Sequence, residues 1–296
     1  MIDFLIAVLR SGTPLIYAAM AGMLAQRAGV WHLGLEGLMI MGACASVLGA
    51  VATGSVSLAL LIAIGVCLAA SLLFWVVIEK LRASPIIAGL GLTGLGLGGT
   101  DLAVQAVYGT QGSVRAPIGL PHPEGFGAFS SLSILVFLMP VVVFALFLVT
   151  RRTRFGLRLA ACGEHPFAAR SVGADPARMR LVALLLGGVL CALAGAELAL
   201  GSLQIFAINM TAGRGFMAFS AVIFGAAHPI GSAAAALFFS VVEALGIRAQ
   251  LAFGNAVPHH FLLMLPYIAT IAGIWLSGRL RGGARAPAGL GELRDA

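Results

Sequence analysis

Charged residues are scarce in this chain of 296 residues. Only 10% of the residues are Asp, Glu, Lys or Arg, whereas 60% are hydrophobic. A soluble globular domain carries about 25% charged residues, so the composition excludes that class and indicates a polytopic membrane protein. The formal net charge of +7 is typical of the basic loops of a membrane protein. We therefore expect membrane lipids around the chain and no nucleic-acid partner.

Lysine and clustered metal ligands are lacking as well. The single lysine, Lys80, follows Glu79 rather than a glycine-rich loop, so the chain has no Walker A motif for ATP hydrolysis. The four cysteines are dispersed and His259 and His260 are adjacent, so we predict no zinc site, no disulfide framework and no cofactor. The glycine-rich run at residues 89–99 has no βαβ unit around it and indicates close packing of helices.

Apolar segments make up most of the chain. We count nine, at residues 4–24, 31–53, 56–78, 85–107, 132–149, 181–201, 215–226, 230–247 and 260–277. Most approach the length of about 20 residues that crosses the hydrocarbon core, so the pattern predicts an all-α bundle of about nine spans. The segment at 215–226 is too short and meets the next one at His228-Pro229. A broken or re-entrant helix pair is therefore expected there.

Arginine is distributed asymmetrically, which predicts the orientation. Fourteen of the 18 Lys and Arg residues lie in segments on one side of the predicted spans, and the other side holds Arg115, Arg214 and Arg248. The positive-inside rule places the first side in the cytoplasm, together with the C-terminus. The loop at residues 150–180 is then cytoplasmic and residues 279–296 form a disordered cytoplasmic tail. The proline-rich segment at 108–131 forms an irregular outer loop.

A faint internal repeat accompanies this pattern. A helix of small residues at 12–23 leads through a break to GVWHLGLEGLMIMGA, and another at 187–200 leads through a break to MTAGRGFMAFSAVIFGA. The first helix starts outside and the second inside, so the two units would be inverted repeats with a solute path at their interface. Coincidence is the alternative, and the pattern alone leaves both open.

The loop at residues 150–180 carries helix signals of its own. Pro166 suits the first turn of a helix and Gly173 its left-handed end, which predicts an exposed helix of about two turns. Asp175 and Pro176 suit the N-cap and first position of the next span. A helix this short is marginal alone and needs a packing partner. The alternative is a solvated basic loop.

Ionisable residues inside the predicted spans are the candidates for a solute pathway. Such a group is costly, and it marks either a functional site or a hydrogen-bonded structural acid; both interpretations stay open. The acids are Glu36, Asp101, Glu197 and Glu243, and the amides near them are Gln105, Gln204 and Asn209. We assign the first three acids and the amides to the pathway. Such a lining suits a neutral polar solute better than a phosphate.

Three stretches of the chain resemble one known family. They are GMLAQRAGVWHLGLEGLMIMGA, GLRLAACGEHPFAARSVGADPARMR and MTAGRGFMAFSAVIFGAAHPIGS, and the similarity extends from about residue 12 to residue 277. They resemble the permease subunits of bacterial ABC importers of the branched-chain amino acid, ribose and nucleoside permease superfamily. The nucleoside or simple-sugar type, served by a Bmp-type lipoprotein receptor, is the most similar branch. Where that family usually has Asn, this chain has His32, which we add to the pathway residues.

The resemblance implies a single transmembrane permease domain at residues 1–296 with a type II ABC importer-like fold of two inverted repeats. It implies that the 150–180 loop is the coupling loop that docks on a separate ABC ATPase subunit. The resemblance assigns this role to six residues of the loop: Gly163, Glu164, Pro166, Ala168, Ala169 and Gly173. Further expected partners are a second permease subunit, a paralogue in a heterodimer, and an external solute-binding lipoprotein. The expected location is the bacterial inner membrane, and the expected solute is a nucleoside, a nucleobase or a simple sugar.

Two other classes remain open. A secondary transporter or channel would need no ATPase, and the arginine-rich loop with its own helix argues against it. A membrane enzyme, such as a lipid-linked transferase, would need acids clustered at one membrane face, whereas the acids here lie in distant segments. The sequence therefore favours a transport subunit that is not itself an enzyme.

Overall fold

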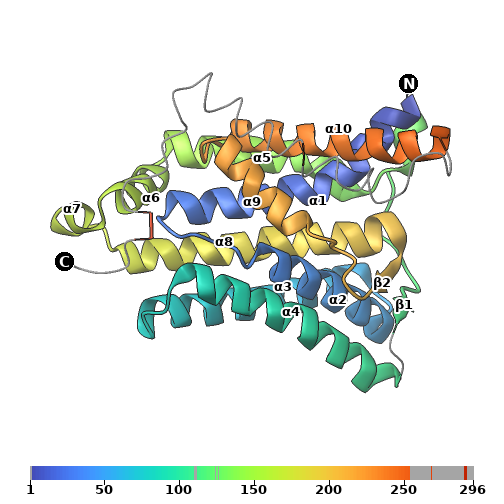
Figure 1. Ribbon diagram of the computed structural model, residues 1–296, viewed down its shortest axis with the longest axis horizontal. Helices are drawn as coiled ribbons and strands as arrows, with labels where there is room; N and C mark the ends of the chain where they lie inside the picture. Colours follow the sequence, from blue (N-terminus) through green and yellow to red (C-terminus); the bar gives the residue numbers. More distant parts are fainter. Residues whose placement is uncertain are drawn as a thin grey trace.

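The structure is a computed structural model that describes residues 2–109, 112–123, 125, 127–253, 268, 290 and 291. In this part, the chain is a bundle of helices with a pair of short strands at one end (Figure 1). Seven helical segments are long and apolar enough to cross a membrane. The predicted class, a polytopic helical membrane protein, is thus confirmed. The ninth expected span at 260–277 and the expected tail at 279–296 lie outside the described residues, apart from 268, 290 and 291, so the count of nine stays a prediction.

Seven long helices form the bundle. They are α1 (Ile2–Arg27), α2 (Leu35–Thr53), α3 (Val56–Trp75), α4 (Pro85–Tyr108), α5 (Ile134–Arg152), α8 (Pro176–Ala196) and α10 (Pro229–Phe253). Two continue as π-helical turns, η1 (Val76–Lys80) after α3 and η3 (Glu197–Leu203) after α8. The short elements are η2 (Gly127–Ser131), α6 (Arg154–Glu164), α7 (Pro166–Ser171), α9 (Arg214–Phe224), β1 (Ser113–Arg115) and β2 (Ile205–Ala207).

Helix α1 lies at the centre of the bundle. All of its residues from Gly12 to Gln26 are buried, and it packs against α8, α9 and α10. A Cβ on Gly12 would lie 2.7 Å from the Ser240 hydroxyl oxygen of α10, so only glycine permits this approach. Small residues are used in this way in membranes because lipid provides no hydrophobic force between helices, and association depends on close packing.

The glycine-rich run at 89–99 lies in α4, and the predicted close packing is confirmed for one face of that helix. A Cβ on Gly96 would lie 2.7 Å from both the Cα and the carbonyl oxygen of Gly37 in α2. On the other face, no atom of the described residues lies within 4 Å of a Cβ built on Gly94 or Gly98. The same run therefore fastens α4 to α2 and leaves a smooth face uncovered.

Two helices begin inside the bundle. After α1, the chain runs back toward the middle of the bundle before α2 begins (Figure 1), and most of residues 28–34 are buried. Helix α9 has only 11 residues, a length of about 16 Å that cannot cross a membrane. A turn at residues 225–228 joins it to α10. The short helix and the break before Pro229 agree with the predicted broken helix pair.

The segment predicted as an irregular outer loop, residues 108–131, is more regular than expected. β1 pairs with β2 in antiparallel register, with the buried Val114 opposite the buried Phe206, and η2 adds a short 3-10 turn. Backbone groups in a partly buried segment must be hydrogen-bonded, and pairing with a second extended segment provides this. Neither segment shows the pairing in its own sequence, because the two strands are distant along the chain.

The segment at 150–180 contains two helices where one was predicted. α7 begins at Pro166 and is followed by Gly173 with φ of +84°, as predicted. Asp175 caps α8, since its Oδ1 accepts a hydrogen bond of 3.0 Å from the backbone N–H of Ala177. Helix α6 was not predicted. It begins after Thr153, whose hydroxyl accepts from the Gly156 N–H.

Candidate functional site

A buried carboxylate joins the starts of α2 and α9. Glu36, in the first turn of α2, is 2% exposed. Its two carboxylate oxygens accept hydrogen bonds from the backbone N–H groups of Gly213, at 2.9 Å, and Gly215, at 2.5 Å. The first N–H groups of a helix have no partner inside it and carry partial positive charge, so a carboxylate is stabilised there. Glu36 therefore ties the N-terminus of α9 to α2.

Glycine at two positions permits this contact. Gly213 has φ of +83°, in the left-handed region that favours glycine. A Cβ on Gly215 would overlap the backbone nitrogen of Glu36. Any larger residue at position 215 would push α9 away from α2. In this conformation both Glu36 oxygens accept hydrogen bonds from the backbone of the α9 N-terminus. Glu36 therefore has a structural role, which is one of the two interpretations left open by the sequence. Its part in the solute pathway stays a prediction.

An ion pair lies beside this junction. Arg214, the first residue of α9, contacts Glu243 of α10 at 2.6 Å between Nη2 and Oε1, and both side chains are largely buried. The arginine distribution predicts that Arg214 lies on the outer side, which stays a prediction; the structure packs its side chain against α10. Charges within a bundle are costly unless they are paired, so Glu243 and Arg214 neutralise each other. In the described part of the chain, the buried atoms Arg214 Nε and Glu243 Oε2 have no hydrogen-bond partner.

His32 is buried in the loop before α2. Its side chain is 1% exposed, and its ring stacks on Phe74 of α3 with a centroid distance of 4.5 Å and an interplanar angle of 17°. Neither ring nitrogen has a hydrogen-bond partner among the described residues. The imidazole therefore packs as an aromatic ring. Contact between His32 and a solute would require Phe74 or the loop to move.

The other predicted pathway residues lie elsewhere. Glu197, at the start of η3, is buried and accepts a hydrogen bond from the Ser133 hydroxyl. Gln204 and Asn209, on either side of β2, are exposed and have φ of 51° and 59°. Among the described residues, no hydrogen bond or ion pair joins two of the seven predicted pathway side chains. The pathway is therefore not one compact cluster in this conformation.

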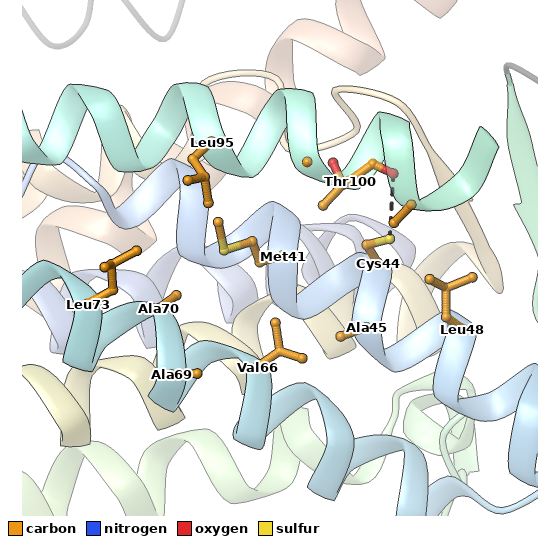
Figure 2. A pocket seen from close by; sticks show the side chains of 12 residues that line it. Met41, Cys44, Ala45, Leu48, Val66, Ala69, Ala70, Leu73, Leu95 and Thr100 are labelled. Atoms are coloured by element: carbon orange, nitrogen blue, oxygen red, sulfur yellow. Dashed lines mark hydrogen bonds between the residues drawn. The ribbon is translucent and has the colours of Figure 1, made fainter. Parts of the chain in front are cut away.

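Asp101 and Gln105 lie on the second half of α4, near a cavity that is not suited to a polar solute. Asp101 is half-buried and Gln105 is exposed. Between α2, α3 and α4 lies a cavity of about 420 Å³ (Figure 2). Its lining is almost wholly apolar, and the Thr100 hydroxyl in its wall already donates to the Gly96 carbonyl at 2.8 Å. The cavity thus offers a polar solute few hydrogen-bonding groups.

The six residues assigned to the coupling loop by resemblance lie on or beside the α6–α7 pair, which projects from one end of the bundle (Figure 1). Two are buried. A Cβ on Gly163 would overlap the carbonyl oxygen of Arg27 at the end of α1, and Ala169 packs with Cys162 and Ala174. The other four are partly or fully exposed: Glu164, Pro166, Ala168 and Gly173.

Large apolar side chains project from the same pair. Phe167 is 75% exposed and Val172 is 82% exposed, and Leu157 of α6 is exposed as well. α6 and α7 lie beyond the segments that can span a membrane. Exposed apolar surface outside the spans is typical of contacts with other proteins or with the membrane surface. Sequence reasoning missed these residues, although the available signal was their apolar character in a loop that is otherwise rich in arginine.

The base of this projection is tied to the end of α3. Arg180 of α8 is buried and forms an ion pair with Glu79 of η1 at 3.2 Å. The indole N–H of Trp75 donates to the Ala177 carbonyl at 3.1 Å. A buried arginine requires a partner, so the first turn of α8 and the end of α3 keep a defined relative position. The partners are about 100 residues apart in the chain, and no local pattern predicts the contact.

These features define a class of protein. Two helices that begin inside a membrane bundle, with ionisable side chains at their junction, are characteristic of membrane transport proteins. The chain belongs to the family described as the branched-chain amino acid transport system / permease component, which matches residues 4–273. The family resemblance seen in the sequence is thereby confirmed. The family consists of multi-pass membrane permeases and not of enzymes.

Several relatives are similar to the chain over most of their length. The chain is 33% identical to the guanosine ABC transporter permease protein NupQ of Bacillus subtilis, over 90% of this chain and 88% of the relative. It is 35% identical to the nucleoside ABC transporter permease protein NupC of Lactococcus lactis, over 88% and 87%. It is 31% identical to a putative glucose ABC transporter permease protein of Haloferax volcanii, over 82% and 77%. No solved structure matches the chain.

Proposed function

We propose that this chain is the permease subunit of an ATP-binding cassette importer and that its solute is a nucleoside. The observation that carries this role is the apolar surface of α6 and α7, with Phe167 and Val172 exposed beyond the membrane spans. An ATPase that docks on the permease would cover such a surface. The relatives support an ABC system. Those named for guanosine or nucleosides are 33% and 35% identical to this chain and those named for glucose 31% and 30%, which favours the nucleoside class.

The ATPase contact is built around α7. Gly163 and Ala169 hold the α6–α7 pair against the bundle, while Phe167 and Val172 point away from it and would insert into the ATPase. Burying a Phe or Val side chain contributes roughly 1.5–3 kcal/mol. A movement of the ATPase would then reach the permease through α6, whose backbone touches the end of α1.

The remaining parts of the importer follow from the orientation. The α6–α7 end and the C-terminus face the cytoplasm of a bacterial cell, and the β1–β2 end faces an external solute-binding lipoprotein. A second, paralogous permease subunit completes the pore. We propose further that α2 and α9 are corresponding members of two inverted repeats; the support is that both begin inside the bundle and meet at Glu36. Alternating access would occur around this junction.

Solute uptake tests this proposal. Membrane vesicles that contain the complete transporter are given labelled guanosine, other nucleosides or glucose, with the intact ATPase or with a variant that lacks its Walker A lysine. We expect saturable nucleoside uptake with the intact ATPase only. Uptake that persists with the inactive ATPase would show that the protein is a secondary transporter and not an ABC importer. ATPase-dependent uptake of glucose alone would support the importer role but show that the solute is a sugar and not a nucleoside.

A matched pair of substitutions tests the docking surface in the same assay. Phe167→Ala removes an exposed ring from α7, and Phe144→Ala removes a ring that is 60% exposed on the spanning helix α5. We expect Phe167→Ala to lower both uptake and co-purification of the ATPase by about tenfold, as the loss of one buried ring implies. Phe144→Ala should change neither. Equal effects of the two substitutions would show that α7 is not the docking element.

A further inference from the structure

The C-terminal ends of three helices converge on one arginine. Arg27 is the last residue of α1. Its Nε donates to the carbonyl oxygen of Ala227 at 2.8 Å, in the turn that follows α9, and its Nη1 donates to the carbonyl oxygen of Thr150 at 3.3 Å, in the last turn of α5. Carbonyls at helix ends have no partner within the helix and attract cations. A planar guanidinium can satisfy two of them at once.

Helix α6 rests on the same two residues. A Cβ on Gly156, near the start of α6, would overlap the backbone of Thr150, and a Cβ on Gly163, near its end, would overlap the carbonyl oxygen of Arg27. The start of α6 therefore contacts the backbone of Thr150, whose carbonyl oxygen Arg27 binds, and the end of α6 contacts the backbone of Arg27 itself. A shift of α6 cannot be absorbed by side-chain rotation at either end.

The turn between α9 and α10 is constrained. Ala226 and Ala227 are consecutive residues with φ of 52° and 50°, a conformation that costs a non-glycine residue about 1–3 kcal/mol and persists only where the surroundings hold it. The Ala227 carbonyl that Arg27 binds is one such constraint. A second is Gly225, where a Cβ would overlap the backbone of Ser232.

Helix α9 is thus held at both ends by side chains from the first third of the chain. Arg27 holds its C-terminal turn, and Glu36 holds its N-terminus through Gly213 and Gly215. A helix of 11 residues held in this way is short enough to carry a displacement from one contact to the other as a rigid element. It links the α6–α7 end of the bundle with the junction at Glu36.

We propose that Arg27 is the positioning residue that transmits movement of α6 to α9, so that displacement at the ATPase contact changes the junction at Glu36. This inference rests on the proposed function, since it needs an ATPase that moves α6. Arginine is required because its fork joins the ends of α5 and α9 simultaneously. Lysine carries its donors on one nitrogen at the end of a flexible stem and has no planar fork, so it cannot reproduce the spacing of Nε and Nη1.

The first experiment separates coupling from folding. Three variants are reconstituted with the ATPase, the second permease and the binding protein: Arg27→Gln, Arg27→Lys and the control Arg82→Gln. Arg82 is an exposed arginine in the turn between η1 and α4. ATPase co-purification, ATP hydrolysis and solute uptake are measured. For Arg27→Gln we expect normal co-purification, hydrolysis within about twofold of wild type and uptake per ATP lowered by about tenfold. Arg27→Lys should be intermediate, and Arg82→Gln should match wild type.

The second experiment follows the turn itself. Ala226 is exposed, whereas the native thiols Cys44, Cys67, Cys162 and Cys191 are buried, so Ala226→Cys provides one reactive site for a membrane-impermeant maleimide. With Arg27 intact, the labelling rate of this cysteine should change when ATP is added. With Arg27→Gln the rate should no longer depend on ATP.

The outcomes are decisive for this inference. Wild-type uptake per ATP in Arg27→Gln, or an unchanged ATP-dependent labelling rate, would overturn it. Loss of ATPase co-purification in both Arg27 variants would overturn it too, because Arg27 would then serve folding alone. If wild-type uptake itself proves independent of the ATPase, the proposed function fails, and this result is distinguishable because it appears before any substitution is made.

Discussion

Glu36 illustrates how one buried side chain can hold two helices together. Its carboxylate accepts hydrogen bonds from two backbone N–H groups at the start of α9, and neither donor is a cationic side chain. Removing an acceptor from a buried donor costs about 1–3 kcal/mol for each donor left unpaired. The contribution of Glu36 to stability therefore depends on both oxygens, and two substitutions can separate them.

Glu36→Ala leaves both N–H groups without an acceptor, whereas Glu36→Gln keeps one acceptor oxygen. We expect the melting temperature of the detergent-solubilised protein to fall by about 5–10 °C for Glu36→Ala and by less for Glu36→Gln. Thermal unfolding followed by size-exclusion chromatography measures both. A melting temperature of Glu36→Ala equal to that of wild type would contradict a structural role for this carboxylate.

Helix α4 has one face that packs and one that does not. Gly96 is in contact with Gly37 of α2, and the Cβ position of Gly98 is open to at least 4 Å in the described structure. The two positions lie in the same helix, in the same glycine-rich run, so they form a natural comparison. The difference between them measures the packing of α4 on α2 and not the helix propensity of glycine.

Gly96→Leu should separate α4 from α2, because its Cβ alone would come within 2.7 Å of Gly37 backbone atoms. We expect the amount of folded protein in membranes to fall several-fold for Gly96→Leu, since overpacking a tight contact costs about 1–3 kcal/mol or more. Gly98→Leu should leave it unchanged. Fluorescence-detected size-exclusion profiles provide the measurement. A similar loss for both substitutions would mean that α4 does not pack as described.

The whole bundle has two chemically different ends. The α6–α7 end carries most of the arginines of residues 150–180, and the opposite end carries the β1–β2 pair. The positive-inside rule predicts that the first end faces the cytoplasm. This orientation decides which end meets an ATPase and which meets a binding protein, so it underlies every functional proposal made for the molecule.

Impermeant thiol labelling tests the orientation. In vesicles that contain the permease without the ATPase, Phe167→Cys on α7 should be labelled only when the vesicles are inverted, and Ser113→Cys on β1 only when they are right-side-out. Both positions are exposed, while the four native cysteines are buried and should react slowly. Labelling of both sites from one side would show that the arginine distribution does not determine the topology.

Much of the molecule was predictable from local signals. The spans follow from apolar length, and α7 follows from Pro166 and Gly173, because these residues act on the backbone within one turn of themselves. The short α9 was predictable from its length and from the proline that starts α10. The acids at Glu36 and Glu243 could be identified as unusual because an ionisable residue stands out within an apolar run, whatever its partner.

The partners of those residues were not predictable. Five contacts join segments that are separated along the chain: Glu36 with the start of α9, Arg214 with Glu243, Arg180 with Glu79, Arg27 with Ala227, and β1 with β2. Composition and spacing establish the class, the spans and the local helix ends, because these depend on short-range interactions and on solvent. Only the tertiary structure decides whether a buried acid serves as a helix cap or as an ion-pair partner. The role depends on which distant group, a backbone N–H or a side chain, is brought within about 3 Å of the acid when the helices pack.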